Sequence, residues 1–176
     1  MRTRRSQSSS DPVLSHDKQR EAGHRSVLLH KVVEALSVVP DDVVVDATLG
    51  GAGHAKHLAE KLGEEGTLIG FDLDADAISR ANLELQGVPP HVHLVQANFR
   101  HIAQEVAKLG IHRITKALFD LGMSSFQLDS GLRHGEAGSG LAKPGRGFSF
   151  LRDEPLLMTY ASEQGPGTLT AERIVN

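Results

Sequence analysis

The chain has 176 residues, of which 39% are hydrophobic, and a formal net charge of −3 at pH 7. This length allows one domain with a substantial core. The net charge excludes a uniformly basic nucleic-acid binder, although a local basic patch on such a protein can still hold phosphates. The sequence contains no cysteine, which excludes disulfides and thiolate metal sites and fits a reducing compartment, so a cytoplasmic location is expected. The apolar runs are strand-length, far short of the roughly 20 residues that span a bilayer, so no membrane partner is expected.

The amino-terminal segment differs in composition from the rest of the chain. Residues 1–23 are rich in arginine and serine and lack hydrophobic periodicity, which predicts a disordered tail. From Ser26, which could act as a cap, apolar residues recur at helical spacing: Leu29, Val32, Val33 and Leu36. We therefore expect a helix before the first strand.

The stretch from Val43 to His54 has the sequence Val-Val-Val-Asp-Ala-Thr-Leu-Gly-Gly-Ala-Gly-His. Three β-branched residues ending at Asp46 predict a strand, and the glycines after it predict a tight loop. Apolar residues then recur at helical spacing: Ala55, Leu58, Ala59 and Leu62. This pattern is typical of the first unit of a nucleotide-binding α/β sheet, whose loop lies at the carboxyl end of its strand and lets the backbone approach a ligand.

The spacing around the loop bears on which cofactor it would hold. A dinucleotide fingerprint requires a third glycine, but Gly51 and Gly53 are followed by Lys56 in that slot. A second strand predicted from Leu68 to Phe71 ends at Asp72, where a carboxylate can accept both hydrogen bonds from a ribose diol. These features favour S-adenosylmethionine. Two alternatives stay open: that Asp72 merely caps the next helix, and that a nicotinamide serves a small-molecule oxidoreductase.

Strands and helices continue to alternate along the chain. Asp74 is expected to cap a helix that stops at Gly87, a third strand is predicted from Val92 to Val95, and after another helix a fourth strand from Ala117 to Phe119 reaches Asp120. Such alternation predicts parallel strands joined by right-handed crossovers. The expected fold class is α/β, a Rossmann-like sheet.

Glycine and basic residues dominate the segment beyond Asp120. Ser130 to Gly147 is expected to form a long loop at the ligand end of the sheet. Basic residues in and just after it could grip RNA phosphates: Arg133, Lys143, Arg146 and Arg152. Thr170 then resembles the cap of a helix within whose first turns the sequence stops, so the sheet is expected to be incomplete.

Four blocks of sequence carry a resemblance to a known family. They are Asp46-Ala-Thr-Leu-Gly-Gly-Ala-Gly-His54, Phe71-Asp72-Leu-Asp74, Asp120-Leu-Gly-Met-Ser-Ser-Phe-Gln-Leu-Asp129 and Arg146-Gly-Phe-Ser-Phe-Leu-Arg-Asp-Glu-Pro-Leu156. From His24 onward the chain resembles the small-subunit (16S) ribosomal RNA cytosine-N4 methyltransferases that use S-adenosylmethionine. The resemblance implies the N-terminal part of a methyltransferase domain over 24–128, a glycine-rich loop and substrate-side segment over 129–167, and the truncated start of an inserted helical domain over 168–176.

The resemblance also implies a set of cofactor contacts: Ala52, Gly53, His54, Asp72, Phe99, Asp120 and Gln127. In this set Asp72 would take the ribose hydroxyls and Phe99 would stack against or flank the adenine. The backbone at Gly53 would approach the methionine moiety. The family usually has glycine where Ala52 stands, so we expect a negative φ at this alanine.

The implied reaction is methyl transfer to the exocyclic N4 of a cytosine in small-subunit ribosomal RNA. That amine is a poor nucleophile, so the enzyme must hold it in line with the methyl group and accept hydrogen bonds from it, after the base has been flipped out of its stack. Asp120 is the candidate catalytic acceptor, and the alternative that it only orients the methionine amino group stays open.

A competing interpretation is a truncated, catalytically inactive cofactor-binding fragment. It is favoured by Leu157 and Thr159, which stand where the family has aspartate and arginine. No metal is expected, because the histidine pairs of the chain (His54 with His57, His91 with His93) lack cysteine or carboxylate partners in a tight cluster. The oligomeric state stays open.

Overall fold

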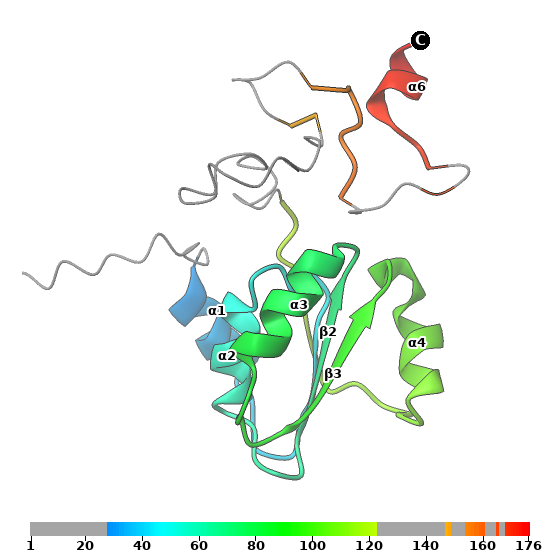
Figure 1. Ribbon diagram of the computed structural model, residues 1–176. Helices are drawn as coiled ribbons and strands as arrows, with labels where there is room; N and C mark the ends of the chain where they lie inside the picture. The colour runs from blue at the N-terminus through cyan, green and yellow to red at the C-terminus, as the bar shows by residue number, and fades with distance from the viewer. Residues whose placement is uncertain (1–27, 123–146, 149–153, 161–164, 166–167) are drawn as a thin grey trace, which may run out of the picture.

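The computed structural model of the chain describes residues 28–122, 147–148, 154–160, 165 and 168–176. Helices and strands alternate as expected (Figure 1). In chain order they are α1 (Leu29–Leu36), β1 (Val43–Asp46), α2 (Gly53–Ala59), β2 (Thr67–Asp72), α3 (Ala75–Glu84), β3 (His91–Gln96), the 3-10 turn η1 (Phe99–His101), α4 (Ile102–Lys108), β4 (Lys116–Leu118) and α6 (Ala171–Val175).

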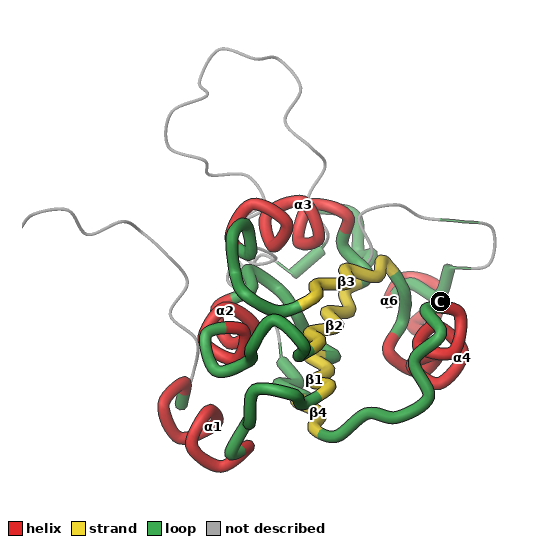
Figure 2. The backbone as a smooth tube through the Cα atoms, turned by 90° about the horizontal axis from the view of Figure 1, so that it is seen from below, coloured by secondary structure: helices red, strands yellow, loops and turns green. Residues whose placement is uncertain are grey.

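The described strands form one parallel sheet in the order β3-β2-β1-β4. In its register Val45 of β1 lies beside Ile69 of β2 on one side and Ala117 of β4 on the other. Seen along the strands, the sheet separates α1, α2 and α3 from α4 (Figure 2). The α/β, Rossmann-like fold class is thereby confirmed.

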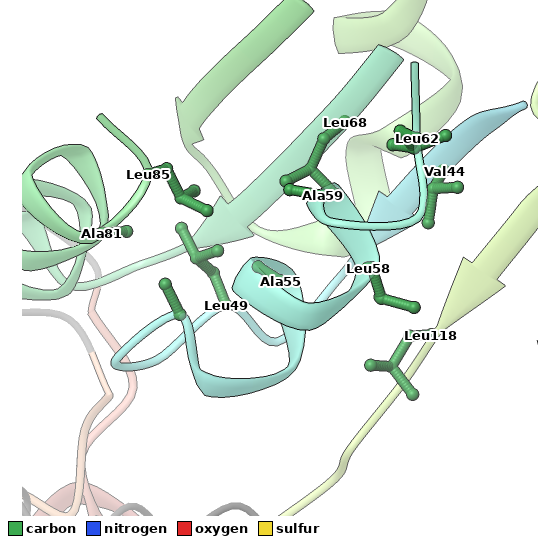
Figure 3. Packing of buried hydrophobic residues seen from close by; sticks show 11 residues of the cluster. Val44, Leu49, Ala55, Leu58, Ala59, Leu62, Leu68, Ala81, Leu85 and Leu118 are labelled. Atoms are coloured by element: carbon green, nitrogen blue, oxygen red, sulfur yellow. The ribbon is translucent and has the colours of Figure 1, made fainter. Parts of the chain in front are cut away.

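Alternate strand residues pack against the two helical layers. Val44 and Leu68 belong to the cluster that includes Ala55, Leu58 and other residues of α2 and α3 (Figure 3). The intervening residues of the same strands pack on the opposite face with Val106 of α4. Because successive side chains of a strand point to opposite faces, this pattern assigns a side of the sheet to each residue that ends a strand.

Two predicted helix caps are confirmed. Asp74 accepts a hydrogen bond at 3.0 Å from the backbone of Asp76 at the start of α3, and Thr170 accepts one at 3.3 Å from Arg173 in α6. Helix α3 ends at Glu84, before Gly87, which has a φ of 75°.

Several expectations concern residues outside the described ranges. These are the tail 1–23, the cap at Ser26, and the loop from Ser130 up to residue 146. None of the helices within the described ranges has the length and apolar character that a bilayer-spanning helix needs.

Candidate active site

Three carboxylates lie at the carboxyl edge of the sheet. Asp46 and Asp72 are the last residues of β1 and β2, and Asp120 follows the end of β4 by two residues. Strand residues at even spacing before them belong to the cluster under α2 and α3: Val44, Leu68 and Leu118. Because side chains alternate along a strand, Asp46 and Asp72 belong to the same side of the sheet as the glycine loop. Asp120 joins them there, since its Oδ2 lies 3.7 Å from Nδ1 of His54 in α2.

The glycine loop is bound to the end of β2 by its own backbone. Leu49 donates a hydrogen bond to the carbonyl of Phe71 at 3.0 Å, and Gly50 donates one to Oδ2 of Asp72 at 2.9 Å. The Leu49 side chain packs over Gly70, where an added Cβ would come within 2.7 Å of its Cδ1. The loop therefore depends on the absence of a side chain at Gly70.

The expectation of a negative φ at Ala52 is wrong. Ala52 has a φ of 62° and is buried as the residue preceding α2. The loop has to reverse direction here, and the Ala52 N–H closes the turn on the carbonyl of Leu49 at 2.8 Å. A left-handed conformation costs a non-glycine residue about 1–2 kcal/mol, which the surrounding contacts must offset.

Asp72 connects two backbone segments through its two carboxylate oxygens. Oδ2 accepts from Gly50, and Oδ1 accepts at 2.8 Å from the backbone of Asp74. The N-cap of α3 is Asp74 rather than Asp72. A carboxylate offers about four acceptor sites, so Asp72 keeps capacity for the two hydroxyls of a ribose.

Asp46 is a buried acid with an unusual proton affinity. Burial raises its pKa to about 7, and the nearby charges of Asp120 and Asp72 raise it as well, while hydrogen bonds from Thr48 oppose the shift. One of these runs from the Thr48 backbone N–H to Oδ1 of Asp46 at 3.1 Å. Asp46 can therefore hold or release a proton near neutral pH.

Asp120 lies on the glycine-loop side of the sheet and is partly exposed to solvent. Its backbone N–H donates to Oγ1 of Thr48 at 2.8 Å, and its Oδ2 lies 3.7 Å from Nδ1 of the buried His54. The Asp120 side chain is 49% exposed, so it can meet a substrate from outside. Thr48 was not singled out by sequence reasoning, although its place between a strand-ending aspartate and the glycines was a usable signal.

An aromatic pair is formed by Phe99 of η1 and Phe119, which follows β4. The rings of Phe99 and Phe119 meet edge to face, with centroids 5.8 Å apart and an interplanar angle of 88°. They are 40% and 48% exposed, which leaves apolar surface for a further ring. Phe119 comes directly after Leu118, the last residue of β4, and its partner Phe99 is the first residue of η1, the turn that precedes α4.

The remaining candidate residues lie on α2 and in the C-terminal part of the chain. Gly53 is the first residue of α2, and its carbonyl lies 3.1 Å from Nδ1 of His57. Gln127 lies outside the described residues. Leu157 accepts a backbone hydrogen bond from Ala171 at 3.0 Å. Within the described ranges, no three His, Cys, Asp or Glu residues are grouped so that they could hold a metal ion.

A glycine loop after β1 and a carboxylate at the end of β2 are typical of a Rossmann-like protein that binds a nucleotide cofactor. The chain belongs to the MraW methylase family, whose model matches residues 21–176. Because the chain belongs to a methylase family, the alternative function of a nicotinamide-dependent oxidoreductase is excluded.

A curated relative, ribosomal RNA small subunit methyltransferase H of Clostridioides difficile (strain 630), is 43% identical over 138 residues. The match covers 78% of this chain and 40% of that protein, so the chain spans well under half the length of this relative.

Solved structures resemble the chain more distantly. A protein from Clostridium thermocellum provisionally named an rRNA methylase is 27% identical, with a TM-score of 0.47 over 54% of this chain and 51% of that one. An rRNA methylase from Streptococcus thermophilus is 22% identical, with a TM-score of 0.43 over 56% and 55%.

Proposed function

We propose that this protein binds S-adenosylmethionine at the carboxyl edge of the sheet and methylates the exocyclic N4 of a cytosine in small-subunit ribosomal RNA. Family membership supports the methylase class. The observation that carries the cofactor assignment is the gathering of Asp46, Asp72 and Asp120 on the glycine-loop side.

The charge of this edge suits one cofactor class better than another. S-adenosylmethionine carries a sulfonium and an ammonium beside one carboxylate, so its net positive charge attracts the acidic edge, whereas the pyrophosphate of a dinucleotide is anionic and would be repelled. Burial is the main cause of the raised pKa of Asp46, and the nearby charges of Asp120 and Asp72 raise it further. The residues present therefore fit an adenosyl cofactor with a cationic amino-acid end.

Each side chain has a proposed role in holding that cofactor. Asp72 accepts the ribose hydroxyls, and Phe99 flanks the adenine with Phe119 behind it. The backbone of Ala52 and Gly53 borders the methionine moiety, together with His54. Gln127 contributes a further contact from the segment after β4.

When bound, S-adenosylmethionine supplies an electrophilic methyl group and leaves as S-adenosylhomocysteine. The chain's own task is to orient the cytosine amine and to receive its proton. Asp120 is half exposed and carries a carboxylate at the sheet edge, so it can accept a hydrogen bond from the amine as positive charge develops there. The Nδ1 atom of His54 lies beside that carboxylate, 3.7 Å from its Oδ2.

The substrate class rests on the same proposal. A cytosine inside a paired helix cannot reach a site at the edge of a sheet, so the base has to be unstacked and inserted, as enzymes that modify bases generally require. With ribosomal RNA as the substrate, the reaction takes place in the cytoplasm.

Two measurements test this function. Titration calorimetry should show that the chain binds S-adenosylhomocysteine and not NAD. The full chain, mixed with small-subunit ribosomal RNA and labelled S-adenosylmethionine, should transfer label to a cytosine. Binding of NAD in place of S-adenosylhomocysteine would contradict the cofactor assignment, and binding without transfer would contradict the enzymatic activity.

The variant Asp120→Asn separates the two roles considered for this residue. If Asp120 accepts the proton of the amine, the variant should bind S-adenosylhomocysteine within about twofold of the unaltered chain and lose at least about a hundredfold in transfer rate. If Asp120 orients the methionine amino group, affinity should fall instead.

A further inference from the structure

We propose that Thr48 is a positioning residue that sets the place of Asp120 at the sheet edge through its hydroxyl group. The inference rests on the proposed function, because the value of a fixed Asp120 lies in the reaction assigned to it. Thr48 itself is not proposed to touch the cofactor or the RNA.

The geometry makes Thr48 a link between two acids on different strands. Its backbone N–H donates to Oδ1 of Asp46 at 3.1 Å, and its Oγ1 accepts from the backbone N–H of Asp120 at 2.8 Å. The ladder between β1 and β4 ends at the pair Asp46 and Leu118. The Thr48 hydroxyl therefore extends the connection beyond the last regular pair.

The Thr48 hydroxyl can also donate a hydrogen bond. An oxygen that accepts from the Asp120 N–H can still donate its own proton. The Thr48 side chain also works to lower the pKa of the Asp46 carboxyl. Through its backbone N–H and its hydroxyl, Thr48 thus connects the buried acid Asp46 to the backbone that carries Asp120. The charges of Asp120 and Asp72 lie close to that acid.

The position of Asp120 depends strongly on this contact. Strand β4 has only three residues and lies at the edge of the described sheet, so it is paired on one side only, with β1. Asp120 lies beyond the strand and is half exposed. With the hydroxyl removed, the N–H of Asp120 would turn to water, and the carboxylate would lose its fixed distance from the glycine loop.

The fold supplies a matched control at the opposite end of the same strand pair. Oγ1 of Thr115 accepts from the backbone N–H of Val43 at 2.9 Å and donates to its carbonyl at 3.1 Å. Like Thr48 and Asp120, these residues are 72 positions apart in the sequence. Thr115 also helps to lower the pKa of a buried acid, Asp42. It thus does similar structural work far from the site.

The experiment compares Thr48→Val, Thr48→Ser and Thr115→Val in the full chain. We would measure the hydrogen exchange rate of the Asp120 amide, the affinity for S-adenosylhomocysteine between pH 6 and 8, and the urea midpoint. In Thr48→Val the Asp120 amide should exchange about tenfold faster, as expected for loss of one hydrogen bond. Affinity should fall about fivefold, and its pH dependence should move to higher pH. Thr48→Ser should restore all three measurements.

Thr115→Val should lower the urea midpoint to a similar extent and leave Asp120 exchange and affinity within about twofold. The inference would be overturned if Thr48→Val and Thr115→Val had the same exchange rate at the Asp120 amide and the same affinity for S-adenosylhomocysteine. The proposed function would still stand in that case. If the unaltered chain does not bind S-adenosylhomocysteine, the proposed function fails and the inference fails with it.

Discussion

The Asp72 carboxylate accepts a hydrogen bond at 2.9 Å from the backbone N–H of Gly50, which lies 22 residues earlier in the chain. This contact joins the glycine loop to the end of the neighbouring strand. The same side chain holds the backbone of Asp74 with its other oxygen. One residue thereby organises the loop and keeps acceptor capacity beyond these two hydrogen bonds.

Stability should depend on pH through Asp46. Its pKa is about 7 in the folded protein, raised mainly by burial, against an ordinary value of 3.8. Between these values the folded state holds more protons than the unfolded state, so the free energy of unfolding falls as pH rises from about 4 to 7. Asp46→Asn removes this slope. Between pH 4 and pH 8 the free energy of unfolding of the variant should therefore rise by up to about 4 kcal/mol relative to that of the unaltered chain. Urea unfolding at both pH values measures this, and parallel profiles for the two proteins would contradict it.

Gly70→Ala should disturb the loop by displacing Leu49. The new Cβ would come within 2.7 Å of a side chain that is buried, and such overpacking costs about 1–3 kcal/mol. Trimming Leu49 to alanine should remove most of the added cost, so a double-mutant cycle followed by urea unfolding should show a coupling energy above about 1 kcal/mol. Additive effects would show that the two residues do not press on each other.

Replacing alanine by glycine should have very different effects at Ala52 and Ala55. At Ala52 the φ of 62° is strained for alanine, so relief of strain offsets the lost methyl group and the change should be nearly neutral. Ala55 is a buried residue inside α2, where glycine should cost about 1–2 kcal/mol. Thermal unfolding of both variants checks the difference, and equal losses would refute it.

The aromatic pair should contribute to affinity as a unit. Phe119→Leu keeps apolar volume but removes the edge-to-face contact with Phe99, a type of contact worth about 0.5–1.5 kcal/mol. We expect affinity for S-adenosylhomocysteine to fall about two- to tenfold in either leucine variant and little further in the double variant. Calorimetry of the two single variants and the double variant measures these affinities. Additive losses in the double variant would show that the two rings act separately.

Much of this fold could be predicted from local sequence pattern. The β-branched run before Asp46, the apolar residues at helical spacing after the glycines, and the caps at Asp74 and Thr170 each express a short-range rule, and each is present in the structure. Asp72 was found because a fixed spacing links it to the glycine loop.

The rest depends on contacts between distant segments. The left-handed conformation of Ala52 arises from a loop closed on Leu49 and β2, which no alanine propensity reveals. Thr48 and Asp120 meet only because β4 pairs with β1. The elevated pKa of Asp46 likewise arises from burial within the folded sheet, so composition alone could not predict it.

Titration of the chain with S-adenosylhomocysteine, beside the variants Asp72→Ala and Asp41→Ala, tests the central claim most directly. Asp41 is an exposed residue before the amino end of β1, so it controls for loss of a carboxylate at the opposite edge of the sheet. We predict binding by the unaltered chain and by Asp41→Ala, and affinity at least about tenfold weaker in Asp72→Ala. That variant loses both the charge-assisted hydrogen bonds to the ribose and the contact that holds Gly50 of the glycine loop. Equal affinity in all three proteins would contradict the account.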